Sequence, residues 1–178
     1  LVAVGIAMRR LKTGAARSAL AAAAEHATRS GITALAAEVE SAARTLEEPA
    51  GRLFERGTDK TVRLMEVEAL LASRLLVVDA CRRVVSRAGE EVSLKTRPVL
   101  FALARALAEA SPGDASRTVL LARAFRAKDA DDSHRARLRV EIGRLRRALA
   151  DLARIEATRD GFVMRPKRDG GVVVLAPA

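Results

Sequence analysis

Residues 133–154 read SHRARLRVEIGRLRRALADLAR and carry the strongest pattern of the 178-residue chain. The large apolar residues of this stretch are spaced by 4, 3, 4 and 3 positions, which places them on one face of an α-helix. They are Leu138, Ile142, Leu145, Leu149 and Leu152. We therefore predict a helix from about Ser133 to Arg154 that is buried along this stripe, with Asp131, Asp132 or Ser133 as its N-cap.

The side opposite the stripe displays basic residues, with Glu141 as the exception. A helix of this kind fits the DNA major groove, where an arginine fork can bond guanine O6 and N7 and a valine can meet a thymine methyl. Gly143, in the middle of this face, lowers helix propensity by about 1 kcal/mol relative to alanine, which favours close approach of a ligand to the backbone. The pattern also fits an arginine-rich, solvated face of an ordinary helix. The candidate contact residues are Arg135, Arg137, Arg139, Val140, Arg144, Arg146 and Arg147.

The distribution of charge singles out the same part of the chain. The net charge is +10, and residues 133–178 hold 11 basic and 5 acidic residues, or +6 of that total. Residues 1–75 and 76–132 contribute +2 each. A localised anion-binding face, rather than a generally basic surface, produces such a gradient.

Composition argues against several other functions. One cysteine cannot form an internal disulfide, and Cys81 with only His26 and His134 cannot build a zinc cluster, so we expect a buried Cys81 and no metal. His26 is expected at the surface, while His134 starts the long helix, where it could touch a phosphate. No pair of residues suited to acid–base catalysis and no nucleotide-binding loop is found, so neither catalysis nor a cofactor is expected. The longest apolar runs are too short for a membrane span.

The first part of the chain has helical periodicity. Alanine-rich segments predict helices over 8–30 and 32–47, with Gly31 as a C-cap between them. This pair resembles the helical hairpins of tetratricopeptide-type proteins. A further helix is expected after Thr58-Asp59-Lys60. Residues 1–74 are thus predicted to form a helical module that supplies dimerisation or a regulatory contact, and the leucine at position 1 leaves open that the sequence is a piece of a longer chain.

From residue 75 onward, short β-branched runs indicate strands at 76–79, 82–85 and 91–94. Helices are expected from Thr96 to Ala110 and after the cap Ser116, and the polar stretch 126–132 separates them from the long helix. A strand, turn and strand over 155–164 then form a hairpin with Arg159 and Gly161 at its tip, and 170–175 adds a last strand.

Several local strings resemble the winged-helix effector domain of OmpR/PhoB-type transcription regulators. They are Gly89-Glu90-Glu91-Val92-Ser93-Leu94-Lys95-Thr96, Ser116-Arg117-x-x-Leu120-x-x-x-x-Phe125 and Glu141-Ile142-Gly143-Arg144-Leu145-Arg146-Arg147-Ala148-Leu149, with Ile155 to Phe162 in the place of the wing. The resemblance covers residues 77–165. It implies base contacts from Arg137, Val140 and Arg144, phosphate contacts from Arg139 and Arg146, and a minor-groove contact from Arg159. Residues 1–75 do not match the family's usual phosphoacceptor domain.

We therefore predict a mainly α protein with small antiparallel sheets, in which an N-terminal helical hairpin (1–74) precedes a winged helix-turn-helix domain (75–178). The expected function is sequence-specific binding of double-stranded DNA by a non-enzymatic bacterial transcription regulator in the cytoplasm, at the nucleoid. A second copy of the chain and RNA polymerase are the expected protein partners. The alternative is a non-catalytic adaptor whose arginines meet an acidic protein surface.

Overall fold

The computed structural model describes residues 1–126 and 132–178, so Asp131, one of the expected caps, lies outside the described residues, as does most of the expected polar separator. The chain forms two compact units. The N-terminal unit comprises Leu1–Gly51 and Thr61–Ala69 together with Ala178, and the C-terminal unit comprises Arg52–Lys60 and Leu70–Pro177. Helices make up about half and strands about a quarter of the described residues.

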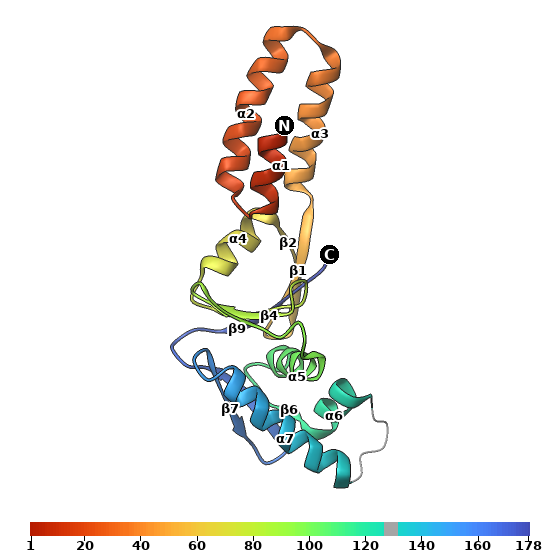
Figure 1. Ribbon diagram of the computed structural model, residues 1–178, viewed down its shortest axis with the longest axis vertical. Helices are drawn as coiled ribbons and strands as arrows, with labels where there is room; N and C mark the ends of the chain where they lie inside the picture. Colours follow the sequence, from red (N-terminus) through yellow and green to blue (C-terminus); the bar gives the residue numbers. More distant parts are fainter. Residues whose placement is uncertain (127–131) are drawn as a thin grey trace. The chain divides into compact units, whose positions relative to one another are not determined.

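Three helices, α1 (Val2–Arg9), α2 (Thr13–Ser30) and α3 (Thr33–Glu47), dominate the N-terminal unit (Figure 1). The single helix expected over 8–30 is wrong in its first part, because the backbone at Leu11 turns to a φ of 52° and separates α1 from α2. Gly31 ends α2 with a φ of 66°, and α3 follows where a helix was predicted. The tight joint at Leu11 lets α1 pack back onto α2.

Residues 49–63 form two strands, β1 (Pro49–Glu55) and β2 (Thr58–Arg63), so the helix expected after Thr58 begins only at α4 (Leu64–Ala72). Arg56 and Gly57 make the two-residue turn with φ angles of 49° and 79°, as the tight turns of β-hairpins require. The apolar residues from Val62 to Leu71 also match helical spacing, so the sequence pattern does not distinguish β2 from the start of a helix.

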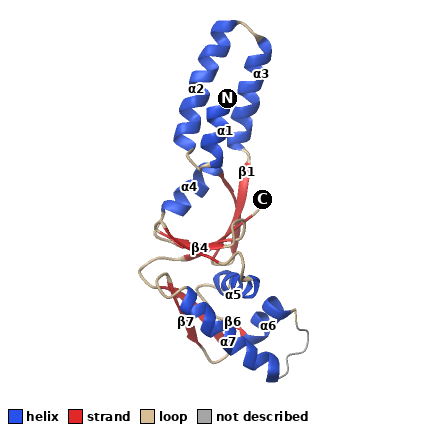
Figure 2. Ribbon diagram, in the orientation of Figure 1, coloured by secondary structure: helices blue, strands red, loops and turns tan. Residues whose placement is uncertain are grey.

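In the rest of the described chain, three strands, a helix, a short strand, two helices and three strands follow in that order (Figure 2). The strands are β3 (Leu76–Asp79), β4 (Val84–Arg87), β5 (Glu90–Ser93), β6 (Ala115–Ser116), β7 (Ala153–Ala157), β8 (Gly161–Pro166) and β9 (Val172–Ala176). The helices are α5 (Pro98–Glu109), α6 (Arg117–Phe125) and α7 (Asp132–Ala148).

The predicted fold class, a helical hairpin followed by a winged helix with small antiparallel sheets, is wrong. The described residues contain a six-stranded mixed sheet in the order β2-β1-β9-β3-β4-β5 and a three-stranded sheet in the order β6-β8-β7. β9 inserts between β1 and β3, antiparallel to the first and parallel to the second. Residues 172–176 are all buried, because a central strand packed on both faces needs an uninterrupted apolar run.

Helix α5 organises the core of the C-terminal unit. Seven of its residues are buried, and it packs against β3, β9, β8, α6 and α7. Ser116 begins α6 as predicted, since its Oγ accepts a hydrogen bond from the Val119 N–H at 3.2 Å. Helix α7 and the β7–β8 hairpin pack against the core formed around α5.

Candidate nucleic-acid interface

Helix α7 is held in the core by the predicted apolar stripe. Leu138, Ile142 and Leu145 are at most 2% exposed, and so are Leu149 and Leu152 beyond the helix end. The helix ends at Ala148 rather than near Arg154, which lies in β7, because the buried spacing continues through the turn that follows. The stripe orients the opposite face of α7 toward solvent, where Val140 is 53% exposed.

Three arginines share this outer face with Val140. The Arg137 guanidinium lies 4.6 Å from the centre of the Phe125 ring at the end of α6. Arg144 donates a hydrogen bond from Nη1 to Glu141 Oε1 at 2.8 Å, so the one acid on this face is already paired. Arg147 has no hydrogen-bond or ion-pair partner within residues 1–126 and 132–178. The outer face thus presents three cations around an exposed valine.

The side of α7 that faces the hairpin carries three more arginines. Arg135 pairs with Asp132 at 3.1 Å, while Arg139 has no such partner in the described chain. Arg146 donates from Nε to the Ile155 carbonyl at 2.7 Å, and its guanidinium lies 5.9 Å from the centre of the Phe162 ring. Arg146 therefore fastens the hairpin to the helix and has only part of its fork left for a ligand.

The β7–β8 hairpin has its turn at Thr158–Asp160, and Arg159 is exposed there. Thr158 Oγ1 accepts the Gly161 N–H at 2.9 Å and also bonds the Asp114 carboxylate. A Cβ at Gly161 would lie 1.8 Å from the Ala115 carbonyl oxygen, so only glycine lets β6 pair with β8 at this point. The turn is thereby held in a fixed conformation.

Arg117, which the sequence pattern did not single out, completes this arrangement. Its Nη1 and Nη2 donate to the carbonyls of Arg159 and Thr158 at 2.8 and 3.1 Å. Arg117 stands at the first position of α6, and nothing in the local sequence links it to a turn some 40 residues later. Only the pairing of β6 with β8 reveals its place.

A cavity of about 290 Å³ lies between α6, α7 and the hairpin. Among residues 1–126 and 132–178, four guanidinium groups and three apolar side chains line it, and no carboxylate does. The lining residues are Arg117, Arg135, Leu138, Arg139, Arg146, Ala157 and Phe162. Such a concave, cationic surface can receive an anionic oxygen cluster such as a phosphate group.

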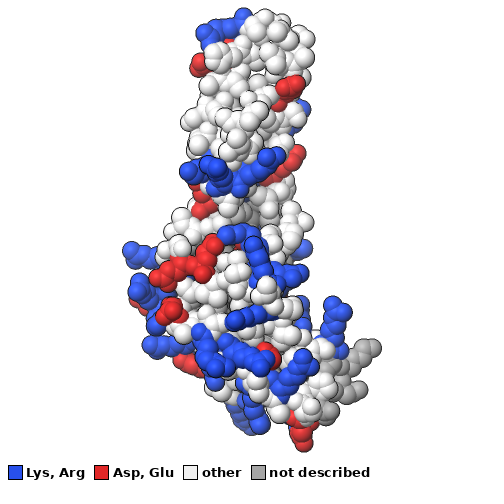
Figure 3. All heavy atoms as spheres, in the orientation of Figure 1, with Lys and Arg blue, Asp and Glu red and all other residues white. Residues whose placement is uncertain are grey.

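Basic side chains also predominate in the lower part of Figure 3, which Figure 1 identifies as the region of α5, α6 and α7. The eight predicted contact residues are therefore not equivalent. Arg137, Val140, Arg144 and Arg147 share the outer face, and Arg135, Arg139 and Arg146 line the cavity beside the hairpin. Arg159 stands apart at the hairpin tip.

The other candidate residues do not gather into a site. Cys81 was expected to be buried and is exposed instead, because it follows β3 in the turn before β4. Partial burial and the neighbouring Asp79 raise the pKa of its thiol. His26 is exposed beside Arg29, and His134 is half-buried on α7. Among the described residues, no three His, Cys, Asp or Glu side chains are grouped so that they could hold a metal ion.

No protein-family model matches the chain, and no curated protein matches it. In the part of the chain that the structure describes, no helix is both long enough and apolar enough to cross a membrane.

Proposed function

We propose that the protein is a sequence-specific double-stranded DNA-binding transcription regulator, with α7 as the element that reads the DNA. The observation that carries the proposal is the outer face of α7. Arg137, Arg144 and Arg147 surround the exposed Val140, and the only carboxylate on this face is paired with Arg144. The outer face is positively charged, and the buried stripe holds α7 in the core. Both properties suit a rigid, polyanionic partner.

The dimensions of DNA support this assignment. The major groove is about 12 Å wide and admits one α-helix. Arg144 has five N–H donors, so pairing with Glu141 leaves several of them for guanine O6 and N7. The ion pair with Glu141 also restrains the guanidinium, which reduces the conformational entropy that Arg144 loses on binding. Val140 is exposed among these arginines, where its side chain could contact a thymine methyl group.

The flanking arginines suit the phosphate backbone. One concave surface is lined by Arg117, Arg135, Arg139 and Arg146 and, within the described part of the chain, by no carboxylate. Phosphate contacts fix the register of a protein on DNA. Arg159 at the tip of the β7–β8 hairpin is the candidate for the adjacent minor groove. In this proposal α7 reads the sequence and the hairpin side determines the docking angle.

The cellular setting belongs to the same proposal. A regulator of this kind works in the bacterial cytoplasm at the nucleoid, with RNA polymerase as a partner and a second copy of the chain on the other half-site. The exposed helices α2 and α3, which belong to the N-terminal unit, offer a surface for that second contact.

Salt dependence tests the proposal. Four guanidinium groups on phosphates predict a slope of about −4 for log K against log salt concentration, because each contact releases condensed counterions. The binding of labelled duplex DNA should therefore weaken steeply between low and near-physiological salt, and one specific site should survive excess competitor DNA. Weak binding that is blind to sequence would contradict the proposal and favour a protein adaptor.

A further inference from the structure

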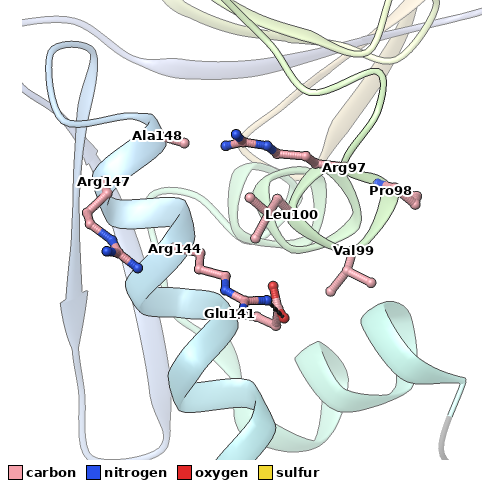
Figure 4. Close-up of a pocket in the computed structure, with 8 residues that line it drawn as sticks. All are labelled: Arg97, Pro98, Val99, Leu100, Glu141, Arg144, Arg147 and Ala148. Carbon is pink, nitrogen blue, oxygen red and sulfur yellow. Dashed lines mark hydrogen bonds and ion pairs between the residues drawn. The ribbon is translucent and has the colours of Figure 1, made fainter.

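A second cavity, of about 640 Å³, lies on the other side of α7, between that helix and the first turn of α5 (Figure 4). Its volume falls within the range of small-molecule pockets in proteins. The lining residues are Arg97, Pro98, Val99, Leu100, Glu141, Arg144, Arg147 and Ala148. All of them belong to the C-terminal unit, and residues of α5 and α7 share one hydrophobic core behind the two walls.

Three guanidinium groups against one carboxylate leave the lining with a net charge of +2. In Figure 4 the side chains of Arg97 and Arg144 extend from opposite walls, each toward the other helix. Glu141 is largely buried, at 12% side-chain exposure, and is bonded to Arg144. Arg97 and Arg147 have no hydrogen-bond or ion-pair partner for their side chains in the described ranges. Two cations of the cavity are therefore unneutralised.

The α5 wall adds to this positive potential. No side chain caps the helix, its first turn holds no acidic residue, and Pro98 occupies its first position. The amide groups and dipole at such a helix end favour a negative group nearby. Between the charges, Pro98, Val99, Leu100 and Ala148 provide apolar surface. Arginines on facing walls around an apolar floor match a ligand with two anionic ends and an apolar body.

We propose that this cavity binds a small organic dianion, with two carboxylate or phosphate groups on a compact apolar body. Arg97 would take one anionic group, Arg144 and Arg147 on the α7 wall would take the other, and the apolar body would lie over Val99 and Leu100. DNA phosphates would leave the apolar floor of the cavity unused, which is why we assign the site to a separate ligand. Since Arg144 and Arg147 also belong to the outer face of α7, the dianion and DNA exclude one another, a step that rests on the proposed function.

Amide chemical-shift mapping of the full chain, without DNA, tests the binding site. The probes are isophthalate, terephthalate and adipate, each with two carboxylates on an apolar body, and inorganic phosphate is the ion without an apolar body. At about 10 mM probe, a ligand with a Kd of about 1 mM nearly saturates its site. We expect at least one organic probe to shift the amides of residues 97–100 and 141–148. Arg97→Gln should weaken that probe about tenfold, the factor that corresponds to about 1.4 kcal/mol.

Two variants make the result specific. Lys95→Gln removes the same charge two residues earlier, outside the lining, and should leave probe binding unchanged. Arg97→Lys keeps the charge and should retain part of the affinity. Arg97 is exposed and its side chain bonds nothing in the described chain, so its variants should keep the wild-type amide spectrum elsewhere. Absence of the expected shifts, equal effects of Arg97→Gln and Lys95→Gln, or equal binding of inorganic phosphate would overturn the proposed site.

Competition with DNA is a separate measurement. The organic probe that binds should displace labelled duplex DNA from the wild-type protein and should displace it about tenfold less effectively from Arg97→Gln. Probe binding without displacement would overturn the proposed exclusion. Failure of the protein to bind any DNA would instead contradict the proposed function, and the shift mapping would still report on the cavity.

Discussion

The ion pair between Glu141 and Arg144 restrains one arginine of the outer face of α7. Replacing Arg144 with alanine removes the proposed base contact, and we expect a loss of about 1–3 kcal/mol of binding free energy for the specific site. The preference at one base pair should relax at the same time. Binding isotherms on the preferred duplex and its single-base variants measure both effects.

Arg44→Ala is the matched control for this change. Arg44 lies on α3, its side chain is 70% exposed, and it pairs with Glu40 across one helical turn. Arg44→Ala therefore removes the same charge and a similar ion pair as Arg144→Ala does. It should bind DNA as the wild type does. Equal losses from the two variants would mean that only net charge, and not the α7 face, is recognised.

Arg139 should behave differently from Arg144. It lines the cavity beside the hairpin and makes no hydrogen bond or ion pair with the described residues, so its proposed role is a phosphate contact. Arg139→Ala should weaken binding to all duplexes alike and reduce the salt slope by about 1. Titrations at several salt concentrations on specific and random duplexes provide the test, and a change in sequence preference would contradict this assignment.

At the level of elements, two glycines make opposite predictions. A Cβ at Gly143 would meet no atom of the described residues within 4 Å, so Gly143→Ala should raise the free energy of unfolding by about 1 kcal/mol through helix propensity. A Cβ at Gly161 would collide with the Ala115 carbonyl. Gly161→Ala should therefore reduce the free energy of unfolding, by an amount near the upper end of the range of about 1–3 kcal/mol. Urea unfolding followed by circular dichroism distinguishes the two. If DNA approaches the backbone at Gly143, that variant should gain stability and lose DNA affinity.

The start of α2 depends on α4. The backbone N–H of Thr13 donates to Glu68 Oε2 at 2.8 Å, and the Thr13 hydroxyl bonds the same carboxylate. These hydrogen bonds lower the pKa of Glu68 below its ordinary value of 4.5. The stabilisation is therefore present above about pH 4.5 and is lost as the pH falls through the lowered value in the folded state.

Thermal unfolding of the wild type and Glu68→Gln across this range checks the prediction. The difference in stability between the two proteins should shrink as the pH falls below about 4.5. Glu38→Gln, at an exposed position on α3, is the control. A difference between wild type and Glu68→Gln that stays constant down to acid pH would show that the carboxylate does not fasten α2.

Local patterns predicted much of the element order. The stripe from Leu138 to Leu152, the cap at Ser116 and the break at Gly31 are confirmed, because each depends on residues close in sequence. The β1–β2 hairpin was missed, since Arg56-Gly57 is a weaker turn signal than Asn-Gly and the following residues also fit a helix. The end of α7 was overestimated because its buried spacing continues into the turn.

At the scale of the whole molecule, the sheet topology could not be read from local patterns. The pairing of Val77 with Val173 and of Leu53 with Leu175 joins segments far apart in the chain, and a run such as 172–176 fits many partners equally well. The same applies to the candidate site. Helical phase selected the α7 arginines, whereas Arg117 and Arg97 reach their places only through tertiary packing.

Selection from a random duplex library tests the central claim most directly. The purified full chain is selected with competitor DNA at near-physiological salt, and the selection is repeated with Arg144→Ala. The account predicts an enriched motif that Arg144→Ala loses or makes degenerate at one base pair, with a two-fold symmetric motif if a homodimer binds. No enrichment by the folded wild-type protein, or the same motif from both proteins, would contradict recognition of DNA by the outer face of α7.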